Sequence, residues 1–209
     1  MSYLSPDVIS TADDLSGRLH AVLALPSSGH SPRIQVSHLA TQLALEHCDA
    51  CRTLLSVGMV PSGMVVLRAQ YEATVRAIWA LYAASDAQIE KLTAVRALDS
   101  EQSAKNLPLV ADMMAALAVK APPEAFDALS RFKDSAWKAL NSYVHAGIHA
   151  LQRQATGYPP VLVDQMFRIS SGFSIVAGMQ AAALTGVQQV MHEVSGLTSS
   201  HQACLPPRL

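Results

Sequence analysis

The stretch Arg68-Ala-Gln-Tyr71-Glu72-Ala-Thr-Val-Arg76 decides the fold class, because its charged residues recur at every fourth position between apolar neighbours. This spacing places side chains above one another on one face of an α-helix. A second stretch, Asn141-Ser-Tyr143-Val-His145-Ala-Gly-Ile-His149, repeats the spacing downstream. Charges and imidazoles are costly to bury unless they are paired, bound to a ligand or used in catalysis. The two stretches therefore predict helices and supply the candidate functional residues.

The rest of the chain also indicates helices separated by short turns, with almost no strand signal. The expected helices cover residues 11–26, 34–57, 62–84, 85–106, 108–119, 121–157 and 159–196. Six or seven helices with short connections predict an all-α, up-and-down bundle. Residues 1–196 are expected to form a single domain and residues 197–209 a loose tail.

The composition favours a protein partner. Half of the 209 residues are apolar and 15% are charged, whereas a typical charged share is about 25%. So few charges predict that some surface is buried against another chain, most simply in a homodimer. The formal net charge of −1 at pH 7 means that nucleic-acid binding would require a local basic patch.

Nothing in the sequence indicates secretion or a membrane span. The N-terminus lacks a secretory apolar segment and the three cysteines are an odd number, so a cytoplasmic location is expected. Residues 169–191 carry no charged side chain, but they contain many serine, glycine, glutamine and threonine residues. That composition is unlike a bilayer-spanning helix. We predict a buried helix whose small residues allow close packing.

The first polar stripe has two interpretations. Glu72 can bridge Arg68 and Arg76 as a purely structural ion-pair ladder. Alternatively, the carboxylate of Glu72 holds two arginines that offer their guanidinium groups to a phosphate or carboxylate. Tyr71 lies on the adjoining apolar flank and is a candidate binding residue.

The second stripe places Asn141, His145 and His149 on one face of the expected helix, with Tyr143 and Lys138 on adjoining faces. The histidines could be hydrogen-bonded core or interface residues. They could also serve in acid/base catalysis or contact a phosphate, since an imidazole titrates near physiological pH. A third interpretation is a shared metal ion.

A metal site needs more ligands than these patterns supply. Two histidines four residues apart require a third and usually a fourth donor, and no glutamate follows His145 directly. A further cluster contains His38, Glu46, His47, Cys48, Asp49 and Cys51. It lacks a second cysteine pair nearby, so core cysteines are the favoured interpretation. We expect neither a metal nor a cofactor.

The Arg-x-x-x-Glu helix and the downstream Asn141-Ser-Tyr-Val-His-Ala-Gly147 segment resemble the HEPN-like bacterial helical proteins over roughly residues 34–187. The resemblance implies a metal-independent ribonuclease of a toxin or defence system, working as a dimer with its active sites at the interface. The usual signature in that superfamily is an arginine, a polar residue and a histidine on one helix. His145 matches the histidine and Asn141 the polar residue, but Lys138 and Leu140 occupy the region where the arginine is expected.

Two functions are consistent with these residues. In the first, an endoribonuclease uses His145 as general acid/base and Asn141 to orient it, while Arg68 and Arg76 stabilise phosphate charge and Glu72 fixes their geometry. The two polar stripes would then face each other across a helix pair, with RNA or a nucleotide as ligand. The second function is a non-catalytic interaction or regulatory module with a protein partner, such as an antitoxin-like or inactive relative. The additional candidate binding residues are Tyr71, Tyr143, His149 and Lys138.

Overall fold

The computed structural model describes residues 3–93 and 107–207, and within these ranges it contains helices and no strand. The prediction of an all-α fold is therefore confirmed. The helices are α1 (Pro6–Leu23), α2 (Pro32–Ser56), α3 (Val60–Tyr82), α4 (Asp86–Thr93), α6 (Val110–Lys120), α7 (Pro123–Val144), α8 (Ile148–Thr156), α9 (Pro160–Thr185) and α10 (Gln188–Ser200), followed by a short 3₁₀ turn, η1 (Gln202–Cys204). The expected end of the fourth helix at Asn106 lies outside the described residues.

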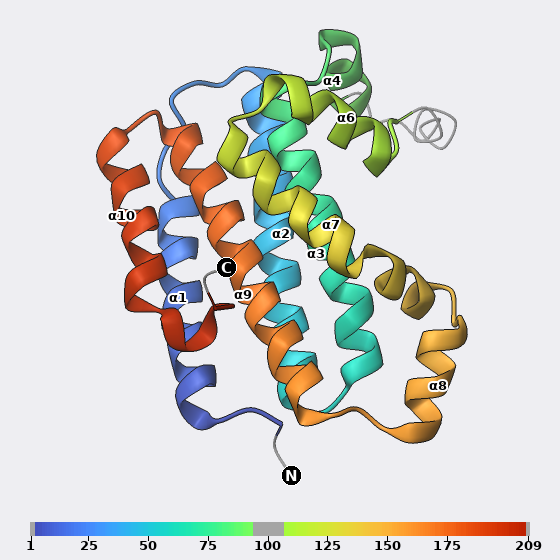
Figure 1. Ribbon diagram of the computed structural model, residues 1–209. Helices are drawn as coiled ribbons and strands as arrows, with labels where there is room; N and C mark the ends of the chain where they lie inside the picture. Colours follow the sequence, from blue (N-terminus) through green and yellow to red (C-terminus); the bar gives the residue numbers. More distant parts are fainter. Residues whose placement is uncertain (1–2, 94–106, 208–209) are drawn as a thin grey trace.

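The α2–α3 hairpin and α9 form the centre of the bundle (Figure 1). Helices α1 and α10 cover one side of α9, and α7 crosses the outer side of α3. Helices α4 and α6 lie at the end of the hairpin where α3 finishes, whereas α8 extends away at the opposite end (Figure 1). No residue of α8 is buried.

The first three helices begin close to, but not always at, the expected residues. Helix α1 starts at Pro6 rather than near Thr11, because the Ser5 hydroxyl accepts a hydrogen bond from Val8 N at 3.3 Å and proline suits the first helical turn. Ser31 caps α2 in the same way. Helix α3 begins at Val60, before the expected cap at Ser62.

The structure contains nine described α-helices rather than six or seven, because two expected helices are each divided. The helix expected over residues 121–157 ends at His145, where Ala146 adopts φ 49° and Gly147 N donates to Ser142 O at 2.7 Å. This is the hydrogen bond of a Schellman helix end, with alanine in the position usually taken by glycine. The helix expected over residues 159–196 ends at Gly186, which has φ 70°.

The composition of residues 197–209 predicted a loose tail, but residues 197–207 are packed against the bundle. Helix α10 continues to Ser200, and both His201 and Cys204 are buried. The His201 ring Nε2 lies 2.8 Å from an Asp14 carboxylate oxygen on α1. Arg168 on α9 donates to the Ala203 carbonyl. The C-terminal segment is therefore fastened to both α1 and α9.

Helix α9 confirms the prediction of a buried helix rich in small residues. Gly178 faces Leu19 of α1, and a Cβ added at this glycine would lie 2.4 Å from the leucine Cδ2 atom. Among the described helices, none is long and apolar enough to cross a membrane. The small residue Gly178 thus allows α9 to pack closely against α1 of the same chain.

Buried hydrogen bonds join the three central helices. Gln70 on α3 donates to the Ser170 carbonyl of α9 at 2.9 Å, and the Ser170 hydroxyl donates to the Gln70 side-chain oxygen at 2.7 Å. Gln180 on α9 donates to the Ser37 hydroxyl of α2 at 2.8 Å. All four side chains are buried. We call these contacts the polar seam.

We predict that Gln70→Leu lowers the free energy of unfolding by about 1–3 kcal/mol, because the buried Ser170 hydroxyl loses its hydrogen bond to the Gln70 side-chain oxygen. The double variant Gln70→Leu/Ser170→Ala should be more stable than the single variant, since neither polar group remains. Urea unfolding of the four proteins in this cycle measures both effects. A double variant that is less stable than Gln70→Leu would contradict the importance of this pair.

Candidate functional site

Arg68 is held on α3 by an ion pair and an aromatic ring. Its Nε donates to Glu72 Oε1 at 2.8 Å, and its guanidinium carbon lies 4.6 Å from the ring centre of Trp137 on α7. The Arg68 side chain is 18% exposed, and its buried Nη1 has no hydrogen-bond partner among the described residues. The contact is geometrically suited to a cation–π interaction that fixes α7 against α3.

Arg76 does not share the Glu72 carboxylate by a hydrogen bond in the part of the chain that the structure describes. Burial lowers the pKa of Arg76, and the nearby negative charge of Glu72 opposes this shift. The ladder therefore consists of one direct ion pair and one more distant, half-buried arginine. It does not form the double bridge that the four-residue spacing allows.

Tyr71 lies in the core rather than at a binding surface. Its ring is fully buried and packs against Phe132, Trp137 and Phe173, with centre-to-centre distances of 4.8–5.6 Å. The hydroxyl donates to the Leu129 carbonyl at 3.2 Å, and burial raises the pKa of Tyr71 well above its ordinary value. We conclude that Tyr71 joins α3, α7 and α9 and is not free to contact a ligand.

The histidines of the second stripe lie on either side of a helix break, so they do not share one helix face as expected. His145 is the exposed residue that ends α7, and His149 is exposed in the first turn of α8. Ser142 fixes the geometry, since its hydroxyl accepts a hydrogen bond from His149 N at 3.0 Å. We call residues 141–153 the elbow. Asn141 is half-buried in the last turn of α7, and Lys138 is exposed one turn earlier.

Three large apolar side chains are exposed beside these histidines. Val144, Ile148 and Leu151 have exposed fractions of 40%, 65% and 63%. Exposed apolar side chains that lie close together mark interaction surfaces more often than isolated ones do. The elbow therefore combines two accessible imidazoles with a surface suited to a protein contact.

The two polar stripes are not joined in the single chain. Helices α3 and α7 do pack together, but the contact of Arg68 is with Trp137, one turn before Asn141. No hydrogen bond or ion pair links His145 or His149 to Arg68, Glu72 or Arg76 within residues 3–93 and 107–207. A catalytic centre that uses both stripes would need groups from elsewhere.

A pocket of about 580 Å³ opens between α3, α7, α8 and α9, and residues of the elbow line part of it. Tyr143 and His149 line it, as do Gln152 and Arg153, which the sequence analysis did not single out. The approach of α8 to α9 that forms this pocket depends on the break at Ala146. The periodicity of the sequence predicted a continuous helix here, so the sequence did not predict the pocket.

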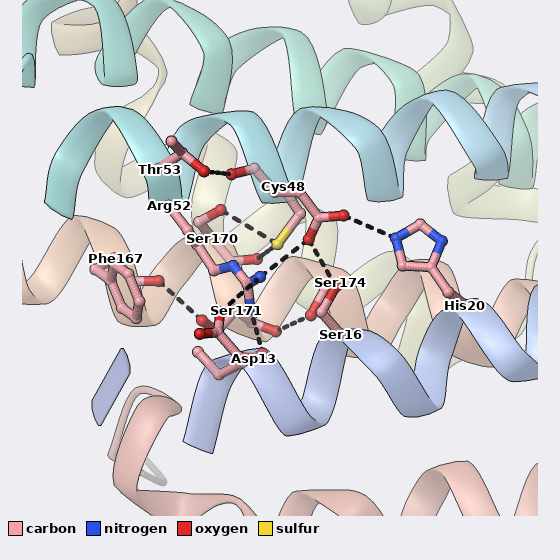
Figure 2. A network of polar contacts seen from close by, with 12 residues as sticks. Asp13, Ser16, His20, Cys48, Arg52, Thr53, Phe167, Ser170, Ser171 and Ser174 are labelled. Carbon is pink, nitrogen blue, oxygen red and sulfur yellow. Dashed lines mark hydrogen bonds and ion pairs between the residues drawn. The ribbon is translucent and has the colours of Figure 1, made fainter. Parts of the chain in front are cut away.

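The sequence analysis also missed an arginine-centred network between α1 and α2 (Figure 2). Arg52 is 9% exposed and donates to the Ala12 carbonyl and, at 3.0 Å, to Asp49 Oδ1. Asp49 also accepts a hydrogen bond from Ser16 at 2.6 Å and lies 2.8 Å from His20 Nε2. Figure 2 shows Ser16 and His20 pointing from α1 toward α2. The hydrogen-bond partners named here all belong to α1 or α2, so we assign this network to the packing of these two helices.

The cysteines near this network lie in the core. Cys48 and Cys51 are buried, and burial raises the pKa of each thiol. Cys48 faces Ser170 of α9, with 3.6 Å between sulfur and the serine oxygen atoms. In the described parts of the chain, no group of three or more histidine, cysteine, aspartate or glutamate side chains is placed to hold a metal ion.

We predict that Glu72→Ala lowers the free energy of unfolding by about 1 kcal/mol. The effect is modest because the Glu72 side chain is 37% exposed and water screens its ion pair. Glu72→Gln keeps a hydrogen-bond acceptor for Arg68 and should lose less. Chemical unfolding of both variants tests this order. Equal stability of Glu72→Ala and the parent protein would mean that Trp137 alone holds Arg68.

The comparisons with known proteins identify a family but not an activity. No curated protein and no solved structure matches the chain. A protein family with the description "Family of unknown function (DUF6988)" matches residues 41–207, from the middle of α2 to the C-terminal segment. This match includes the elbow, the pocket and both polar stripes, and the chain therefore belongs to the DUF6988 family.

Proposed function

We propose that this protein is a metal-independent endoribonuclease of a toxin or defence system and that its active site forms at the elbow in a homodimer. The observation that carries the proposal is the exposure of His145 and His149 beside Val144, Ile148 and Leu151. Two imidazoles suited to proton transfer thus lie on a surface suited to a second copy of the chain. The resemblance to HEPN-like proteins supports the same arrangement.

RNA cleavage without a metal requires two proton transfers. A base takes the proton of the ribose 2′-hydroxyl as it attacks the phosphorus, and an acid protonates the departing 5′-oxygen. In our proposal His145 performs one of these transfers. His149, or the His145 of a second copy, performs the other. Asn141 lies one turn before His145 on α7 and orients it or the phosphate.

Positive charge near the phosphate comes from exposed or half-exposed residues of the same region. Lys138 is exposed on α7 and Arg153 is half-buried on α8. Arg68 has a different role in this proposal, because Glu72 and Trp137 already hold its side chain. It fixes the position of α7, from which the elbow extends. Arg76 adds a second positive charge two turns farther along α3.

We predict that His145→Ala lowers the rate of RNA cleavage at least about 100-fold, because general acid/base groups typically contribute a factor of this size or more. His149→Ala should also reduce the rate. The assay follows cleavage of a labelled single-stranded RNA in the presence of EDTA. His192→Ala is the matched control, since His192 is exposed on α10, far along the chain from the elbow. Absence of cleavage by the parent protein, or full activity of His145→Ala, would contradict the ribonuclease proposal.

We also predict that the protein is a homodimer and that Ile148→Glu/Leu151→Glu converts it to a monomer. A charge placed at each exposed apolar position would have to be desolvated in the contact. Analytical ultracentrifugation at tens of micromolar measures the change. Val119→Glu on α6 is the control, because Val119 is 84% exposed and belongs to another surface. A monomeric parent protein would refute the dimer.

A second function is favoured by one feature of the elbow. No cation of the described residues forms an ion pair or hydrogen bond with His145 or His149, and the arginine expected before His145 is absent. An inactive relative that binds a protein partner through the exposed apolar residues would need no such cation. In this case His145→Ala would leave binding intact, whereas Ile148→Glu/Leu151→Glu would abolish it.

A further inference from the structure

The pocket between α7, α8 and α9 has a predominantly apolar floor. The apolar side chains that line it come from α3, α7 and α9 and are Met64, Ala136, Ala139, Leu140, Leu162 and Met166. These side chains are aliphatic and offer no hydrogen-bond donor. Methionine is flexible and adapts to irregular apolar shapes. The volume of about 580 Å³ lies in the range of small-molecule sites.

The rim of the pocket is polar and positively charged. Its polar lining residues are Ser135, Tyr143, His149, Gln152, Arg153 and Thr156. The side chains of His149, Gln152 and Arg153 make no hydrogen bond or ion pair with the described residues. Among the described residues that line the pocket, Arg153 alone carries a permanent charge and none is a carboxylate. An unpaired guanidinium above an apolar floor is electrostatically complementary to an anionic head group.

Tyr158 borders the pocket without lining it, because it packs beside the lining residue Tyr143. It lies in the loop between α8 and α9, and the ring centres of Tyr158 and Tyr143 are 6.5 Å apart. Burial and the adjacent Tyr143 raise the pKa of Tyr158 to about 12, whereas the charge of Arg153 opposes this shift. Arg153 therefore extends its field over the same corner.

We infer that the pocket binds a medium-chain aliphatic carboxylate, with its chain on the apolar floor and its carboxylate at Arg153. An aliphatic chain fits against the six apolar lining side chains, which offer no hydrogen-bond donor. Arg153 supplies two parallel N–H groups that match the geometry of a carboxylate. This inference does not depend on ribonuclease activity.

Isothermal titration calorimetry of the full chain with octanoate tests the inference, with 1-octanol as the uncharged probe. Octanoate should bind once per chain and more tightly than 1-octanol. Arg153→Gln should weaken octanoate binding about tenfold, which corresponds to about 1.4 kcal/mol, and leave 1-octanol binding unchanged. Ala139→Phe should abolish binding of both probes by filling the pocket, because Ala139 lines it.

Two control variants keep the test specific. Arg131→Gln removes an exposed charge from α7 outside the pocket, and Ala155→Phe adds a ring to an exposed position of α8 that does not line it. Both should bind octanoate as the parent protein does. Circular dichroism checks that each variant remains helical.

Three results would overturn the inference. The first is an absence of octanoate binding at millimolar concentration. The second is octanoate binding that neither Arg153→Gln nor Ala139→Phe changes. The third is saturable binding of adenosine monophosphate that depends on Arg153 while octanoate does not bind, which would make this a nucleotide site. Since no RNA is present in these titrations, the result is independent of the proposed cleavage activity.

Discussion

The polar seam between α2, α3 and α9 is the constraint on which the rest of the bundle depends. Gln70 on α3 and Ser170 on α9 hydrogen-bond to each other in the core, and Gln180 on α9 donates a hydrogen bond to Ser37 on α2. A buried amide that loses its partner is costly, so sliding α9 by one turn against the hairpin would leave several groups unpaired. The seam thereby fixes the register of α9. With that register set, Gly178 lies where Leu19 of α1 can approach closely.

Helices farther from the seam are held by fewer interactions, and the candidate functional surfaces lie there. Helix α7 is attached to α3 through Tyr71 and the stacking of Arg68 on Trp137, whereas α8 buries no residue at all. Regions with few buried contacts open at a lower free energy than the core does. The elbow and the pocket therefore occupy the part of the described chain best able to adjust to a ligand or partner, while the seam keeps the scaffold fixed.

The parts of this structure that the sequence predicted are those determined by local spacing. The ion pair of Arg68 and Glu72 follows from their separation of four residues, and proline and serine mark the start of α2. Contacts between segments far apart in the sequence could not be predicted from local spacing. The Arg52 network joins residues about 40 positions apart, and His201 meets Asp14 across 187 positions. The polar C-terminal segment consequently resembled a tail, although its partners on α1 and α9 hold it in place.

The helix break at Ala146 shows why the candidate site was harder to predict than the fold. A left-handed conformation is rare for alanine, so the sequence favoured an uninterrupted helix with His145 and His149 on one face. The next residue explains the observed turn. A Cβ at Gly147 would lie 2.8 Å from the Ser142 hydroxyl oxygen, and that same oxygen accepts a hydrogen bond from His149 N. Glycine thus permits the approach of Ser142 that starts α8, and the positions of both imidazoles follow from this turn rather than from helical periodicity.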